Sequence, residues 1–178
     1  MEITIDDVTL ELVRGDIASQ EGFDAVVNAA NAQLRSGGGV AGAIHRAAGP
    51  QLAEAGRDLA PIEPGEAVIT DAFDLPNERV IHCLGPVYGE DEPADELLAR
   101  CYREALALAD EEGLSSIAFP SISTGAFGYP LREAAEVALE TVLEQVPGLA
   151  SVERIRFVLW GEDALEAWED ALAAVRGG

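Results

Sequence analysis

Short apolar runs alternate with amphipathic stretches along this chain of 178 residues. Several runs are continuously apolar, among them residues 25–27, 117–119 and 157–159, which is typical of strands buried on both faces of a sheet. The apolar runs predict strands over residues 9–14, 25–28, 67–70, 79–84, 116–119 and 155–160, with a further short candidate at 2–5.

Between these strands, apolar residues recur with helical spacing and predict helices over residues 41–48, 50–60, 94–112, 131–145 and 164–175. Turn-forming residues mark several ends: Gly49-Pro50 separates the first two helices, and Pro147-Gly148 stops the fourth. The alternation predicts an α/β fold, namely a three-layer α/β/α sandwich with a mixed, mostly parallel central sheet. We expect residues 1–178 to form a single domain, because no linker or break in composition interrupts the pattern.

The charge balance excludes two classes of partner. There are 33 acidic residues against 11 basic ones, every basic residue is arginine, and the formal net charge is -22. Because phosphate contacts need a basic surface, we expect neither a nucleic acid nor an anionic membrane as partner. Self-repulsion of this size destabilises the compact state in dilute buffer, whereas molar salt screens it. We therefore expect a cytoplasm of very high salt, as in halophilic microbes, with an acidic mesophilic protein as the alternative.

The sequence offers no signal for export or for anchoring in a membrane. Its apolar runs are far shorter than a membrane span of roughly 20 residues, and the N-terminus lacks the features of a secretory signal. We expect a cytoplasmic monomer. Cys83 and Cys101 are the only cysteines, which predicts buried free thiols. Together with His45 and His82 they fit no zinc pattern, so we expect neither a metal nor another cofactor.

Two glycine-bearing loops carry the candidate chemistry. The first follows an apolar run and reads Asn-Ala-Ala-Asn at residues 28–31, then Gly-Gly-Gly-Val-Ala-Gly at 37–42. The second reads Phe-Pro-Ser-Ile-Ser-Thr-Gly-Ala-Phe-Gly-Tyr-Pro at 119–130. Glycine lets the backbone approach a ligand closely, and the N–H groups at a helix start favour an anion. Both loops lead from a strand to a helix, so we expect them to grip a diphosphate from two sides.

Residues 37–42 also satisfy the Gly-x-Gly-x-x-Gly fingerprint of dinucleotide-binding enzymes. That motif belongs in the tight turn after the first strand, whereas here eight residues separate it from the strand ending at Asn28. The acid that binds the ribose would have to be Glu54 or Asp58, and both lie on a predicted helix. We therefore set a hydride-transferring dinucleotide enzyme aside, and the lack of lysine excludes a P-loop.

Four ordered motifs together resemble the macrodomain family. They are the two loops, the His-Arg-Ala-Ala-Gly-Pro of residues 45–50, and the Val-Ile-His of 80–82 followed by Gly-Pro at 85–86. The motifs are most similar to the MacroD-type branch of ADP-ribose-binding hydrolases, which includes O-acetyl-ADP-ribose deacetylases. The resemblance extends over nearly the whole chain, from about residue 13 to residue 160. It implies that ADP-ribose or an ADP-ribosylated protein is the partner.

The resemblance implies where the adenine end of the ligand lies. Asp16 accepts a hydrogen bond from the adenine amino group, with the Ile17 backbone beside it, and a carboxylate suits this contact because it is an acceptor only. Trp160, at the end of the last strand, stacks on the adenine. Without the resemblance, Asp16 is interpreted equally well as a helix or turn cap, and Trp160 as packing at a strand end.

The resemblance places the rest of the ligand between the loops. Asn31 hydrogen-bonds the distal ribose close to the bond to be cut, and Phe127 packs on the same ribose, whereas Asn28 holds the loop. The loop contacts comprise Gly38, Gly39 and Val40 near the distal ribose and its phosphate, and Ser123, Thr124, Gly125 and Ala126 around the diphosphate. Two residues are implied to be catalytic: Asn31 orients the attacking water, and His45 transfers or orients a proton. A structural histidine satisfied by neighbouring backbone is the alternative for His45.

Two positions depart from the MacroD-type pattern. Residue 41 is Ala where the branch carries an Asp that activates or positions the water, and residue 127 is Phe where the branch usually has Tyr. Macrodomains with the same Val-Ala-Gly spelling are still regarded as hydrolases, in which the phosphate of the substrate assists the water. General-base help is worth about 10²–10⁴-fold, and positioning supplies comparable factors. We therefore expect a slow hydrolase of protein mono-ADP-ribose or O-acetyl-ADP-ribose, with a non-catalytic ADP-ribose reader as the alternative.

Overall fold

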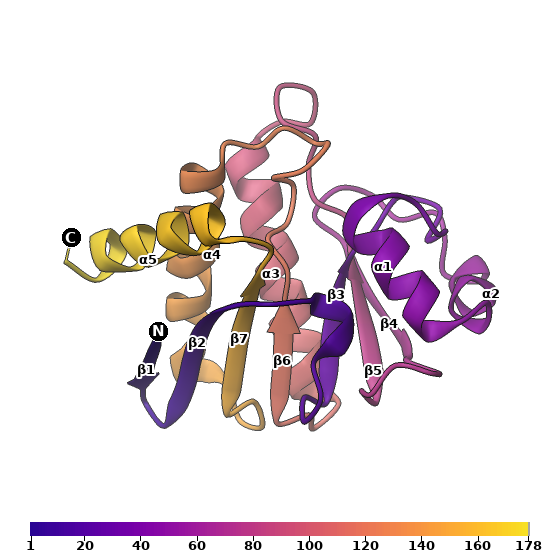
Figure 1. The fold of residues 1–178 in the computed structure, drawn as a ribbon, viewed down its shortest axis with the longest axis horizontal. Coiled ribbons are helices and arrows are strands. Elements are labelled where there is room, and N and C mark those ends of the chain that lie inside the picture. Colours follow the sequence, from indigo (N-terminus) through magenta and orange to yellow (C-terminus); the bar gives the residue numbers. More distant parts are fainter. Residues whose placement is uncertain (178) are drawn as a thin grey trace.

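A seven-stranded sheet crosses the centre of the molecule in the computed structural model, which describes residues 1–177 (Figure 1). Its strands lie in the order β1-β2-β7-β6-β3-β5-β4. They are β1 Glu2–Ile5, β2 Val8–Arg14, β3 Ala25–Ala29, β4 Ala67–Asp71, β5 Arg79–Cys83, β6 Ser116–Phe119 and β7 Arg154–Leu159. The five inner strands pair in parallel, whereas β1 and β4 are antiparallel edges. The predicted mixed, mostly parallel sheet is therefore confirmed.

Helices cover both faces of the sheet and complete the predicted sandwich (Figure 1). They are α1 Gly39–Ala48, α2 Gln51–Arg57, α3 Ala94–Glu111, α4 Leu131–Gln145 and α5 Glu162–Gly177, with short 3-10 turns η1 Ile17–Ser19 and η2 Val146–Gly148. The larger hydrophobic cluster joins one face of the sheet to α3, α4 and α5. A smaller cluster joins the other face to α1, α2 and η1. The continuous apolar strands seen in the sequence are therefore buried on both sides.

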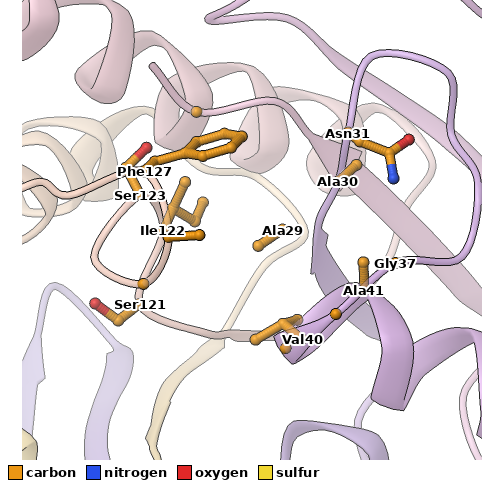
Figure 2. Close-up of a pocket in the computed structure, with 15 residues that line it drawn as sticks. Ala29, Ala30, Asn31, Gly37, Val40, Ala41, Ser121, Ile122, Ser123 and Phe127 are labelled. Atoms are coloured by element: carbon orange, nitrogen blue, oxygen red, sulfur yellow. The ribbon is translucent and has the colours of Figure 1, made fainter. Parts of the chain in front are cut away.

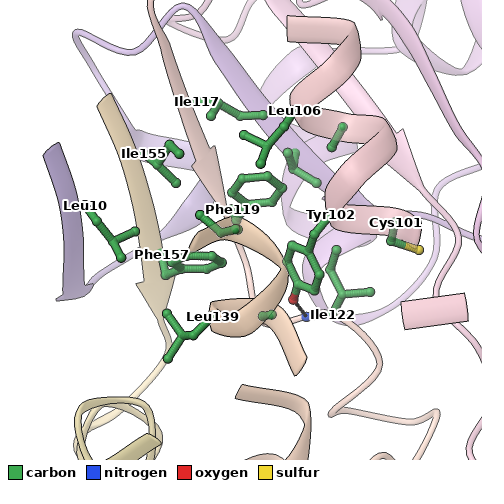
Figure 3. Packing of buried hydrophobic residues seen from close by; sticks show 14 of the residues in the cluster. Leu10, Cys101, Tyr102, Leu106, Ile117, Phe119, Ile122, Leu139, Ile155 and Phe157 are labelled. Atoms are coloured by element: carbon green, nitrogen blue, oxygen red, sulfur yellow. Dashed lines mark hydrogen bonds between the residues drawn. The ribbon is translucent and has the colours of Figure 1, made fainter. Parts of the chain in front are cut away.

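Aromatic side chains fill the larger core, and one of them is hydrogen-bonded to the loop that follows β6. The rings of Phe119 and Phe157 are stacked, and the Tyr102 ring is tilted against both, with ring centroids 5.3 to 6.0 Å apart (Figure 3). The Tyr102 hydroxyl accepts a hydrogen bond of 3.3 Å from the backbone N–H of Ile122. The start of the loop after β6 is thus anchored to the core and cannot shift freely.

Several helix boundaries differ from the sequence predictions by one to three residues, and α5 is two residues longer at each end than predicted. Helix α1 begins at Gly39, two residues earlier than predicted, because the glycine loop itself forms its first turn. Helix α2 ends at Arg57, three residues earlier than predicted, where the backbone N–H groups of both Leu59 and Ala60 donate to the carbonyl of Gly56. The residue before a proline is disfavoured in the helical conformation, so Pro61 explains the early stop.

Cys83 and Cys101 are buried free thiols, as predicted. Burial raises the pKa of the Cys101 thiol to about 12, so it stays protonated and unreactive. Among the helices of residues 1–177, none combines the length and apolar character needed to cross a bilayer.

Candidate binding and active site

A cavity of about 390 Å³ opens at the carboxyl ends of the inner strands, between the loops that follow β3 and β6 (Figure 2). Residues 29–31 and 37–41 form one wall, residues 121–123 and 125–127 form the other, and Gly85 also lines the cavity. The two glycine loops therefore face each other across one cavity, as the sequence predicted. Ligands of parallel α/β sheets bind at this edge.

Asn31 stands on the first wall, and its side chain holds the loop that follows. Its Oδ1 accepts a hydrogen bond of 3.0 Å from the Arg35 backbone N–H, and its Nδ2 donates one of 2.8 Å to the Arg35 carbonyl. An amide nitrogen carries two N–H groups, so one remains available to a ligand in the cavity. Asn31 is thus held in place by the loop and still offers a donor to the ligand.

The first turn of α1 supplies donors to the same wall. Gly38 is the N-cap, and the first helical hydrogen bond runs from the Gly42 N–H to the Gly38 carbonyl. The N–H groups of Gly39, Val40 and Ala41 therefore have no acceptor within the helix. A Cβ at Gly42 would overlap the carbonyl oxygen of Gly37, so only glycine allows the loop to fold back onto the helix here. The result is a ready anion site at the helix start.

The second wall is a tight loop built around Ser123. Ser123 has a φ of 68°, which is rare for a residue with a side chain, and its buried Oγ has no partner among residues 1–177. The Tyr129 N–H donates to the Ser123 carbonyl at 2.9 Å, which closes the loop. The Thr124 hydroxyl is hydrogen-bonded to Ser121 at 2.8 Å, and Thr124 does not line the cavity although the sequence assigned it to the diphosphate. Phe127 lies across the cavity from Asn31 (Figure 2).

Gly85 is a lining residue that the sequence interpretation did not assign to the site. It follows β5, and a Cβ there would overlap the Ser123 Oγ and come within 2.6 Å of the Ile122 Cγ2. The Gly-Pro pair directly after an apolar strand was the available signal. Gly85 lines the cavity because the end of β5 packs closely against the second loop, and this contact between distant segments cannot be read from a local sequence pattern.

Asp16, Ile17 and Trp160 do not line this cavity; they lie together beyond the carboxyl ends of β2 and β7. The two strand ends are joined by a hydrogen bond of 2.9 Å from the Gly15 N–H to the Leu159 carbonyl. The Asp16 Oδ1 caps η1 by accepting from the Ala18 N–H at 2.9 Å, and Ile17 is buried in the smaller core cluster. Trp160 is 84% exposed, so its ring is free to stack on a flat ligand.

His45 is buried in α1 and does not line the cavity. Its Nε2 has no partner within residues 1–177, and burial lowers the pKa of His45. His82 belongs to a buried chain of hydrogen bonds: the Asn28 Nδ2 lies 3.1 Å from its Nδ1, and Thr70 Oγ1 lies 3.0 Å from its Nε2. Because the amide nitrogen can only donate, Nδ1 accepts and Nε2 carries the proton. Asn28 and His82 thus support β3 and β5 beneath the cavity.

This chain of hydrogen bonds predicts a pH dependence of stability. Burial, with a smaller contribution from His45, lowers the pKa of His82 from 6.5 to about 3. The unfolded chain therefore binds more protons between those pH values, and the contribution of His82 is present above pH 6.5 and lost as the pH falls toward 3. The unfolding free energy decreases from neutral to acidic pH, and we expect this decrease to be roughly 1–3 kcal/mol smaller in His82→Gln than in the wild-type protein. Urea titrations at constant salt test this, and a variant with the wild-type slope would contradict it.

The cavity contains no ionisable side chain among the described residues that line it. The Ala41 methyl group lies where the MacroD-type pattern has an aspartate, and Phe127 offers no hydroxyl. Within residues 1–177, no cluster of three or more His, Cys, Asp or Glu side chains is placed to hold a metal ion. The cavity can therefore bind an anion through backbone N–H groups, the Asn31 amide and hydroxyls, but it provides no general base.

These features define an α/β protein with a cavity at the carboxyl edge of its sheet, where backbone N–H groups are placed to bind the diphosphate of a nucleotide. Residues 27–138 match the model of the Macro domain, and the chain belongs to the macrodomain family. It is 48% identical to a macro domain-containing protein of Chlorobaculum tepidum, over 95% of this chain and 98% of that one. It is 46% identical to the O-acetyl-ADP-ribose deacetylase of Klebsiella pneumoniae, over 92% of this chain and 96% of that one.

Solved structures share the fold closely. The Oceanobacillus iheyensis macrodomain with ADP superposes with a TM-score of 0.94 at 41% identity, over 99% of this chain and 96% of that one. The Trypanosoma brucei macrodomain in complex with ADP-ribose superposes with a TM-score of 0.85 at 37% identity, over 92% of this chain and 68% of that one. The macrodomain resemblance and the fold predicted from the sequence are therefore confirmed.

Proposed function

We propose that this protein binds ADP-ribose and hydrolyses the ester that links it to an acyl group, either the acetyl of O-acetyl-ADP-ribose or an acidic side chain of a protein. One observation carries the proposal: two loops with free backbone N–H groups face each other across a single cavity at the carboxyl edge of the sheet. Relatives named O-acetyl-ADP-ribose deacetylase and neighbours with bound ADP or ADP-ribose support it.

In this proposal the ligand extends from the residues at the ends of β2 and β7 into the main cavity. The adenine lies at the ends of β2 and β7, where the exposed Trp160 ring stacks on it. Asp16 has one carboxylate oxygen in its cap and the other free to accept from the adenine amino group. The diphosphate lies between the start of α1 and the loop around Ser123, where N–H donors neutralise it without a basic side chain. The distal ribose reaches the mouth between Asn31 and Phe127 (Figure 2).

Catalysis in this cavity relies on position and on the ligand itself. The free N–H of Asn31 orients a water against the ester, and a phosphate oxygen of the ligand takes the proton of that water. With an ADP-ribosylated acidic side chain, the water oxygen bonds to the anomeric carbon of the distal ribose, the bond from that carbon to the side chain breaks, and the carboxylate leaves with the electron pair. With O-acetyl-ADP-ribose, the water oxygen bonds to the acetyl carbon, the bond from that carbon to the ribose oxygen breaks, and the ribose oxygen leaves with the electron pair and takes up the proton. His45 acts from beneath as a positioning residue for α1, because it has no direct access to the cavity. Turnover is slow because a general base normally adds about 10²–10⁴-fold.

A reader of ADP-ribosylated proteins is the second candidate. The cavity favours it in one respect, since the described lining residues include no ionisable side chain and residue 41 is alanine. Binding without turnover needs only the N–H donors and the aromatic contacts.

Release of label from an auto-ADP-ribosylated protein separates the two functions. We expect the wild-type protein to release ADP-ribose and Asn31→Ala to release it about 10²-fold more slowly, since positioning of the water is lost. The assay is run in molar KCl beside calorimetry with ADP-ribose. Intact ADP-ribose binding without release by the wild-type protein would leave the reader as the function.

The charge supports a cytoplasm of very high salt as the setting of this reaction. We expect the melting temperature to rise by several degrees or more between dilute buffer and molar KCl, because salt screens the repulsion among 33 acidic residues. A melting temperature that stays constant across the KCl titration would speak for an acidic mesophilic protein.

A further inference from the structure

A second pocket borders the segment that follows Asn31 in the loop after β3. It has a volume of about 300 Å³ and is lined by Gln33, Arg35, Ala53, Arg57 and Ala60. It therefore lies between the loop after β3 and helix α2, and two arginines are among its lining residues. Two cations in one small pocket are unexpected in a chain with a formal net charge of -22.

Neither arginine is used to hold the fold. The arginines that form ion pairs within the described chain are Arg14, Arg79, Arg100, Arg132, Arg154 and Arg156. Arg35 and Arg57 form none with any residue of 1–177, although Glu54 and Asp58 are close to Arg57 in sequence. Both side chains are exposed. Two cations without a counter-charge thus border an open pocket.

The segment that borders both cavities is held firmly. Asn31 accepts from the Arg35 N–H and donates to the Arg35 carbonyl, so the two residues are tied through the backbone. Buried Leu34 packs closely on α2, because a Cβ added at Gly56 would lie 2.8 Å from the Leu34 Cβ. One hydrogen-bonded segment thus contributes Asn31 to the main cavity and Arg35 to the second pocket.

We infer that this pocket binds carboxylate side chains of the polypeptide that carries the ADP-ribosyl group, so that the substrate class is an ADP-ribosylated acidic segment. The inference rests on the proposed function, because it places the scissile ester beside Asn31. A guanidinium group binds a carboxylate in a bidentate manner, and such short contacts are screened less by salt than longer-range attraction is. Elsewhere the acidic surface repels such a segment, whereas the pocket provides two unpaired cations next to the place where the ester lies.

The test compares peptides that carry one ADP-ribosyl glutamate, flanked either by glutamates or by glutamines. Calorimetry measures affinity with the wild-type protein and with the double variant Arg35→Gln/Arg57→Gln. We expect the double variant to lose about tenfold or more in affinity for the glutamate-flanked peptide. Its affinity for the glutamine-flanked peptide and for free ADP-ribose stays the same. The double variant Arg103→Gln/Arg176→Gln is the matched control, because it removes the same charge and both residues are exposed and form no ion pair within residues 1–177.

Three results would overturn the inference. The first is equal affinity of the wild-type protein for the two peptides, and the second is an equal loss by the double variant on both peptides and on ADP-ribose. The third is a preference of the wild-type pocket for a second ADP-ribose unit over flanking glutamates, which would assign the pocket to phosphate. Failure of the proposed function would give a different result. A protein that binds ADP-ribose but does not hydrolyse it still shows the difference in affinity between the glutamate-flanked and glutamine-flanked peptides. If the protein binds no ADP-ribose, the affinities of the wild-type protein and the double variant are compared with the unmodified glutamate-rich peptide.

Discussion

Replacing Ala41 by aspartate is expected to raise the rate of ADP-ribosyl release by roughly 10²-fold. Ala41 lines the main cavity on the first turn of α1, so a carboxylate there reaches the water that attacks the ester. An acidic residue in the first turn of a helix is also compatible with the helix dipole, so the fold accepts the change. Single-turnover release of label from an ADP-ribosylated protein measures the effect.

The matched control for this prediction is Ala41→Asn. Asparagine has nearly the same shape as aspartate but cannot take a proton from water, so we expect it to leave the rate near that of the wild-type protein. ADP-ribose affinity is measured for both variants, since a carboxylate near the diphosphate weakens binding while it accelerates the reaction. Equal rates for the two variants would show that a general base is not what the cavity lacks.

Replacing Gly85 by alanine is expected to lower the affinity for ADP-ribose by roughly 10²-fold or more, which corresponds to about 2.7 kcal/mol of binding free energy. The added methyl group overlaps the Ser123 Oγ and comes within 2.6 Å of Ile122. The loop cannot retreat without losing the hydrogen bond between Ile122 and the Tyr102 hydroxyl. Its N–H groups therefore move away from the diphosphate. Calorimetry with ADP-ribose measures the loss.

A second substitution tests the cause of this loss. Ser123→Gly in the Gly85→Ala background removes the overlapping hydroxyl and suits the φ of 68° at that position, so we expect partial recovery of affinity. Gly148→Ala is the control for folding, because a Cβ there meets no atom within 4 Å and Gly148 lies outside the cavity. If the double variant bound no better than Gly85→Ala alone, the contact with Ser123 would not explain the effect.

The order of strands and helices could be predicted because each element has its own pattern. Continuous apolar runs marked the strands buried on both faces, and Gly49-Pro50 and Pro147-Gly148 marked helix ends. The boundaries at Gly39 and Arg57 were less accurate. The first depends on a glycine loop that folds back onto its own helix, and the second on hydrogen bonds around Gly56. These contacts form only when the loop and the helices are in place.

The site was predicted unevenly for the same reason. Asn31, Gly38, Gly39, Val40, Ser123, Gly125, Ala126 and Phe127 line the cavity, and each belongs to a motif that is continuous in sequence. Thr124 and His45 belong to the same motifs but face other partners or the core. Side-chain direction within a loop or helix follows from packing, so the motif alone did not distinguish lining residues from supporting ones.

By itself, the sequence determined the alternation of elements, the two glycine-bearing loops, the alanine in place of an aspartate, and the formal net charge of -22. These are local properties, since spacing, glycine content and charge are read directly along the chain. Only the tertiary structure brought Gly85 against Ser123, left Trp160 exposed beside Asp16, and placed Arg35 and Arg57 around one pocket. Such contacts join segments that are distant in sequence, and the packing of the sheet and its helices decides which of those segments meet.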